Sequence, residues 1–128
     1  MIPGKVLIID DNRANLKLAR VILSLEGLDV HTALSAEEAL TVLDSFTPDL
    51  ILMDLQLPGI DGLQLTRQLK ADPNRRQITV LAVTAYAMKG DMEKALAAGC
   101  DGYVSKPFDP PTLCSLVQHH ITSKRTGL

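Results

Sequence analysis

The chain has 128 residues, 46% of them hydrophobic, and a formal net charge of −2, which suits one packed domain and argues against disorder. Charges of both signs are mixed along the chain, so no basic surface for nucleic acid is expected. No apolar run approaches the roughly 18 residues that span a bilayer, no secretory signal is visible, and the only cysteines are Cys100 and Cys114, so we expect the reducing cytoplasm.

The first predicted unit is a strand over residues 5–9 followed by a helix over 12–26, which Gly27 ends. Helical spacing places a set of apolar residues on one wide face of that helix. This set is Leu16, Leu18, Ala19, Ile22, Leu23 and Leu25.

The second predicted unit begins with a more polar strand over 29–33, which we expect near a sheet edge. Ser35 then stands three residues before Glu38, which is the arrangement of a capping box at a helix start. Apolar residues follow it at helical spacing, and these are Ala36, Ala39, Leu40 and Leu43.

The third and fourth predicted strands, over 49–54 and 78–83, are apolar on both faces and should be buried on both. Helices are predicted after them, over 62–71 and 89–98. The side chains expected to face inward from these two helices are Leu65, Leu69, Met92, Ala95 and Leu96.

The last predicted unit follows Gly99, which is expected to end the fourth helix. It pairs a short strand over 102–106 with a helix that starts at Asp109 and has Pro110 at its first helical position. Its apolar stripe is Leu113, Leu116, Val117, His120 and Ile121.

Five strand–helix units in a row predict an α/β domain, with a parallel sheet covered by helices on both faces. We expect a single domain over residues 1–128, with a core from about 5 to 121.

Polar residues stand where the predicted strands end: Asp10 and Asp11 after the first, Asp54 at the third, Thr84 at the fourth and Lys106 at the fifth. The carboxyl ends of strands in a parallel sheet share one edge, where ligands bind. These five side chains are therefore expected to meet in one crevice.

The charges in that crevice predict a cation. The three carboxylates carry three negative charges, which a divalent ion and Lys106 together would balance. Oxygen ligands without a nearby Cys or His favour Mg²⁺ or Mn²⁺ over zinc. A metal, a lysine and a hydroxyl around a carboxylate indicate phosphoryl transfer, with Asp54 as the best candidate nucleophile.

Four stretches, "LIIDDN", "DLILMDLQLPGIDG", "VLAVTA" and "GYVSKPF", resemble the signature stretches of response-regulator receiver domains. The resemblance runs from about Lys5 to Ile121, and the combination is highly specific. It implies a flavodoxin-like, doubly wound sheet in the order 2-1-3-4-5, flanked by five helices.

The resemblance also assigns roles around the metal. Asp54 would accept a phosphoryl group from a histidine kinase or a histidine phosphotransfer protein. Asp11 and the backbone carbonyl of Gln56 would ligate Mg²⁺ directly, and Asp10 would act through a water.

Further roles implied by the resemblance fall on the other side of the crevice. Thr84 and Lys106 would bind the phosphoryl group, and Tyr103 would be an aromatic switch that turns inward as Thr84 moves. The peptide bond before Pro107 would be cis. Gln56 and Tyr86, two residues after Asp54 and Thr84, would tune the lifetime of the phosphoryl group.

A receiver of this kind is a signalling switch and not a conventional enzyme, because the only substrate consumed is its own aspartyl phosphate. Its output surface would be formed by the fourth helix, fifth strand and fifth helix and would control a protein partner. We expect a monomer or a weak phosphorylation-dependent dimer, with no nucleic-acid or membrane partner. The chain would be a stand-alone receiver or a domain of a hybrid kinase.

Three other functions fit the sequence less well. A phosphatase of the haloacid dehalogenase type needs a second acid where this chain has Gln56. A flavodoxin-like FMN carrier needs a phosphate-binding loop after the first strand and aromatic residues, which make up only 3% here. A pseudo-receiver that is never phosphorylated would lack key residues that this chain retains.

Overall fold

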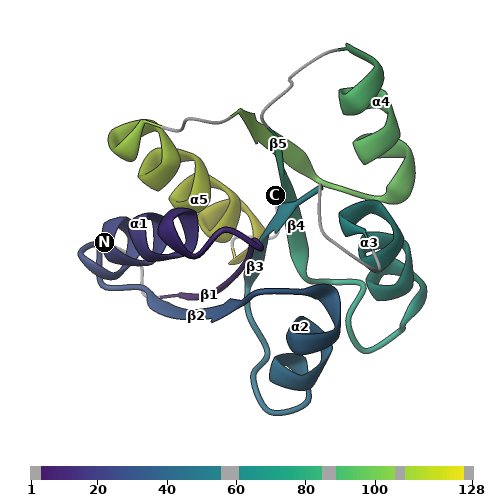
Figure 1. The fold of residues 1–128 in the computed structure, drawn as a ribbon, viewed down its shortest axis with the longest axis horizontal. Coiled ribbons are helices and arrows are strands. Elements are labelled where there is room, and N and C mark those ends of the chain that lie inside the picture. Colours follow the sequence, from purple (N-terminus) through teal and green to yellow (C-terminus); the bar gives the residue numbers. More distant parts are fainter. Residues whose placement is uncertain (1–3, 56–60, 85–88, 106–108, 126–128) are drawn as a thin grey trace.

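The computed structural model describes residues 4–55, 61–84, 89–105 and 109–125. Within these ranges strands and helices alternate along the chain (Figure 1). The elements are β1 (Lys5–Ile9), α1 (Arg13–Ser24), β2 (Asp29–Ala33), α2 (Ala36–Leu43), β3 (Leu50–Asp54), α3 (Gly62–Ala71), β4 (Thr79–Thr84), α4 (Lys89–Ala98), β5 (Gly102–Ser105) and α5 (Pro110–Arg125).

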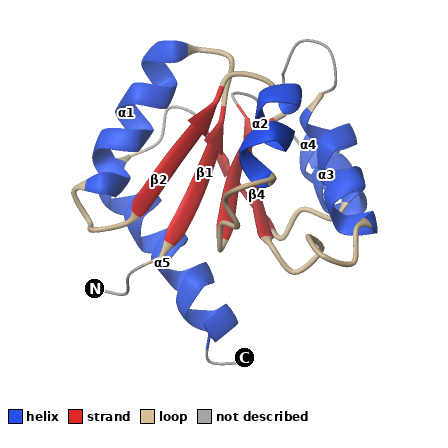
Figure 2. Ribbon diagram, turned by 90° about the horizontal axis from the view of Figure 1, so that it is seen from below, coloured by secondary structure: helices blue, strands red, loops and turns tan. Residues whose placement is uncertain are grey.

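The strands form one parallel sheet in the order β2-β1-β3-β4-β5, which confirms the predicted fold class. Figure 2 shows the sheet between two layers of helices. Side chains of α1 and α5 pack on one face of the sheet and those of α2, α3 and α4 on the other. The more polar strand β2 is at an edge, as expected, and β3 is central and fully buried.

Short polar side chains cap the starts of α1, α2, α3 and α5. Each cap accepts a hydrogen bond from the backbone N–H three residues later, at 2.8–3.2 Å, and so satisfies a donor that the helix leaves unpaired. The capping residues are Asn12, Ser35, Asp61 and Asp109. Gly27 and Gly99 follow the ends of α1 and α4 with φ of 85° and 109°, which favours glycine and confirms both predicted stops.

Three leucines expected to face inward are exposed instead. On α1 the core side is formed by Leu16, Ala19 and Leu23, while Leu18 and Leu25 are 53% and 81% exposed. These two residues project from the opposite side, because the apolar face of this helix is wider than the part that contacts the sheet. On α4, Ala95 and Ala98 are buried, whereas Leu96 is 56% exposed.

The predicted bounds differ slightly from the observed ones. β4 runs from Thr79 to Thr84 and not from residue 78 to 83, and α1 is shorter at both ends than the segment 12–26. Both cysteines are free and buried, and among the described residues no helix could cross a membrane.

Candidate functional site

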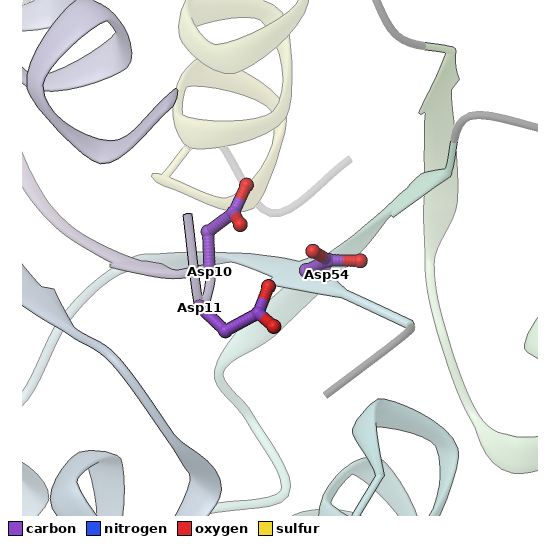
Figure 3. Close-up of side chains that lie close together, drawn as sticks. All are labelled: Asp10, Asp11 and Asp54. Carbon is purple, nitrogen blue, oxygen red and sulfur yellow. The ribbon is translucent and has the colours of Figure 1, made fainter. Parts of the chain in front are cut away.

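Three carboxylates meet at the carboxyl edge of the sheet. Asp10 and Asp11 directly follow β1, and Asp54 is the last residue of the neighbouring strand β3. One oxygen from each carboxylate lies within 4.8 Å of the others (Figure 3). The structure therefore brings these acids together, as the strand-end pattern predicted.

The acids differ in their exposure. Asp10 and Asp54 are 4% and 5% exposed, whereas Asp11 is exposed and leaves its side of the cluster open to solvent. The Asp10 amide donates to Ala33 of β2 at 3.1 Å, and its carboxylate accepts the N–H of Asn12 at 2.9 Å. Because Asn12 is the N-cap of α1, the start of this helix fixes the position of Asp10.

The backbone of Asp54 is held from the other side by α3. A Cβ atom at Gly62 would collide with the Asp54 carbonyl oxygen and stand 2.9 Å from the Cα atom of Leu55, so only glycine allows this approach. The sequence indicated Gly62 only as a helix start and missed this supporting role. The adjacent capping residue Asp61 indicates that a helix starts here, but no local pattern shows that this start approaches Asp54.

Thr84 and Tyr103 lie on the strands beyond Asp54. Asp54 is in register with Val83, the residue before Thr84, and Thr84 is in register with Ser105 of β5. Thr84 is buried at 4% exposure, while Tyr103 is at the surface at 36%. Four other residues with predicted roles fall outside the described residues, and these are Gln56, Tyr86, Lys106 and Pro107.

The donor set at this edge suits a hard cation. Three carboxylates so close together repel one another, and the repulsion is strongest where burial excludes water. A divalent ion relieves it, and oxygen-only ligands are those that Mg²⁺ and Mn²⁺ prefer. In the part of the chain that the structure describes, this is the one group of three acids, histidines or cysteines placed to hold a metal.

Comparisons with known proteins agree with this geometry. The family model described as "Response regulator receiver domain" matches residues 6–118. The polar-differentiation response regulator DivK of Brucella anthropi is 41% identical over 119 residues, which cover 93% of this chain and 97% of that protein. DivK of Brucella ovis is 42% identical over 116 residues, 91% of this chain and 94% of that protein.

Solved structures show the same fold. A CheY-like response regulator receiver domain protein from Methanospirillum hungatei has a TM-score of 0.90 at 28% identity, covering 99% of this chain and 100% of that one. A putative response regulator from Chloroflexus aurantiacus has a TM-score of 0.89 at 30% identity, covering 94% and 99%.

Proposed function

Because the chain belongs to the response regulator receiver domains of two-component signalling, we propose that Asp54 is where this phospho-accepting switch takes up its phosphoryl group. The observation that carries the proposal is the acid cluster, in which Asp54 ends the central strand beside Asp10 and Asp11. A carboxylate oxygen of Asp54 would attack the phosphorus of a phosphohistidine, forming the O–P bond as the P–N bond breaks.

Receiver domains bind Mg²⁺ at an acidic pocket, and the Asp cluster is compatible with such an ion. Asp11, Asp54 and the Gln56 carbonyl would hold it, with Asp10 acting through a water. The bound ion would offset charge on the phosphoryl oxygens. The Thr84 hydroxyl and the Lys106 ammonium would bind those oxygens from the opposite side.

The proposed response is a shift between two arrangements of the α4–β5–α5 surface. Thr84 would move toward the phosphoryl group, and Tyr103, now at the surface, would turn inward. A receiver domain implies a histidine kinase or phosphotransfer protein upstream and a protein target downstream. We place this exchange in the cytoplasm and expect no enzymatic turnover beyond formation and slow hydrolysis of the aspartyl phosphate.

The proposal is tested with acetyl phosphate and Mg²⁺, followed by mass spectrometry of the intact protein. We expect one added phosphate in the wild type, and none with EDTA or in Asp54→Asn. The matched control is Asp29→Asn, which removes an exposed acid of β2 and should leave the adduct unchanged. An adduct that persists in Asp54→Asn would rule out Asp54 as the acceptor.

The lifetime of the phosphoryl group gives a separate prediction. A bulky Tyr86 near the acceptor would hinder the water that hydrolyses the aspartyl phosphate. The phosphorylated wild type should therefore decay more slowly than phosphorylated Tyr86→Ala, as followed by loss of the adduct over time. Equal or faster decay of the wild type would contradict this role.

A further inference from the structure

One face of α3 contacts both the end of β3, where Asp54 lies, and the carboxyl end of α4. Gly62, Thr66 and Lys70 are spaced four residues apart and therefore lie on the same side of this helix. Each of them contacts a different segment, and the three contacts together run the length of α3. Figure 1 shows α3 beside α4, and the two helices are in contact.

The first contact is with Asp54, the proposed phosphoryl acceptor. Gly62 lies directly against the backbone of Asp54 and Leu55, and its N–H donates to the Leu55 carbonyl at 3.4 Å. Because no space is left there for even one carbon atom, a displacement of the Asp54 backbone is transmitted to the start of α3.

The second contact is at the middle of the helix. Thr66 is completely buried, and its hydroxyl donates to the Gly62 carbonyl at 2.7 Å. The same hydroxyl oxygen accepts the thiol of Cys100 at 3.8 Å. Burial raises the pKa of Cys100, so the sulfur keeps its proton and remains a donor. The Cys100 amide in turn donates to Ala95 of α4 at 3.0 Å.

The third contact is the most extensive. The Lys70 ammonium donates to the carbonyls of Ile78 and Arg76 at 2.7 and 3.2 Å and to the carboxylate of Asp101 at 3.0 Å. These three bonds use all the protons of the ammonium group. The side chains of Lys70 and Asp101 are 22% and 42% exposed, so water and salt screen this ion pair in part.

Lys70, Asp101 and Gly99 together form a joint between α3 and the carboxyl end of α4. The Asp101 carboxylate also accepts the N–H of Val80 at 2.8 Å, and the Asp101 amide donates to the Val80 carbonyl at 2.7 Å. A Cβ atom at Gly99 would lie 2.7 Å from Cγ of Lys70, so the lysine stem packs on the glycine backbone. This turn is thereby fixed to α3 and to the first residues of β4.

We propose that the Gly62–Thr66–Lys70 face of α3 is a restraint that couples Asp54 to the carboxyl end of α4 and holds α4 in its unphosphorylated position. Among the side chains of α4 that the structure describes, only the small Ala95 and Ala98 are buried, while Leu96 is exposed, so the position of this helix depends on this joint. The inference rests on the proposed function, because it assigns Lys70 as a positioning residue for the switch at Asp54.

Losing the Lys70 bonds should change the equilibrium between the two arrangements in one direction. In this proposal the Lys70 bonds are made in the unphosphorylated arrangement and lost in the other, so removing them shifts the population toward the phosphorylated arrangement. Coupling between two sites is reciprocal, and its usual size is 5- to 150-fold in affinity. Loss of the joint should therefore raise the affinity of the site for a phosphoryl group.

The test is a titration with beryllofluoride, a phosphoryl mimic, in the presence of Mg²⁺. We expect Lys70→Met, which keeps the length of the stem, to bind it at least about 5-fold more tightly than the wild type. Hydrogen exchange should be faster at the amides of Asp101 and Cys100 and unchanged in β1. The matched control Lys17→Met removes an exposed lysine of α1 and should behave as the wild type.

Second variants keep the test decisive if Lys70→Met folds poorly. Asp101→Asn and the near-isosteric Thr66→Val should each tighten binding, and Lys70→Met combined with Asp101→Asn should do little more than either alone. Binding within twofold of the wild type in variants with faster exchange at Asp101 would overturn the restraint while leaving Asp54 as the acceptor. A wild type that binds no beryllofluoride would overturn both.

Discussion

Asp11 is the exposed member of an otherwise buried acid cluster, so it is the side chain through which the charge of the site is most easily changed. Replacing it with Asn removes one of three mutually repelling charges. We expect Asp11→Asn to melt at a higher temperature than the wild type in EDTA, and to bind Mg²⁺ about 10-fold or more weakly.

Thermal melts in EDTA and across a Mg²⁺ titration measure both effects. Glu93→Gln is the matched control, because Glu93 is an exposed acid of α4 and lies outside the cluster. The metal assignment would be wrong if Asp11→Asn kept the Mg²⁺-dependent rise in melting temperature that the wild type shows.

The meeting of the three acids could be predicted from sequence, because each follows or ends an apolar run and parallel strands end at one edge. Their unequal exposure could not. It depends on how β2, which accepts the Asp10 amide at Ala33, and α3, which packs behind Asp54, lie against the acids, and both are tertiary contacts. The roles of Gln56, Tyr86, Lys106 and Pro107 stay predictions.

At the scale of elements, the first residue of α3, Gly62, should reverse the usual effect of replacing glycine with alanine in a helix. Glycine to alanine in a helix usually stabilises a protein by up to about 1 kcal/mol. In Gly62→Ala the new methyl group meets the backbone of Asp54 and Leu55, which cannot rotate away. We expect a loss of roughly 1–3 kcal/mol in the free energy of unfolding.

Gly90 on α4 is the matched control, since a Cβ atom added there would meet nothing within 4 Å beyond the backbone of its own helix. Gly90→Ala should leave stability unchanged or raise it by up to about 1 kcal/mol. Urea unfolding of both variants measures the difference. Equal effects from the two substitutions would show that Gly62 does not support Asp54.

Helix starts and stops were predictable because caps and glycine stops are local chemistry, as at Ser35, Gly27 and Gly99. The apolar residues that face the sheet were harder to predict. Leu18, Leu25 and Leu96 satisfy helical periodicity yet are exposed, because the contact area of a helix is set by its neighbours. Periodicity gives a direction but not the width of the buried stripe.

For the molecule as a whole, His120 gives stability a dependence on pH. Partial burial on α5 lowers the pKa of its imidazole, the positive charge of His119 lowers it further, and Asp101 opposes the shift. A lowered folded-state pKa means that the stabilising contribution is complete above the unfolded value of about 6.5 and is lost as pH falls through the folded value.

We therefore expect the urea midpoint of the wild type to fall between pH 7.5 and pH 5, and to fall less in His120→Asn. The comparison between the two proteins removes the contribution of the carboxylates, which both share. An equal fall in both would show that His120 stays as easily protonated in the fold as in the unfolded chain.

The order of the strands is a property of the whole molecule that local patterns do not contain. Alternating strands and helices predicted a parallel sheet, but the order 2-1-3-4-5 came from the resemblance and is the order observed. That order makes β1 and β3 neighbours and so places Asp54 beside Asp10 and Asp11.

The most direct measurement of this arrangement is the position of the phosphoryl group. After incubation with acetyl phosphate and Mg²⁺, borohydride reduction converts a phosphorylated aspartate to homoserine, which peptide mass spectrometry locates. The expected result is homoserine at residue 54 and at no other aspartate. Homoserine at residue 10 or 11, or a chain that yields none, would contradict the assignment of Asp54 as the acceptor.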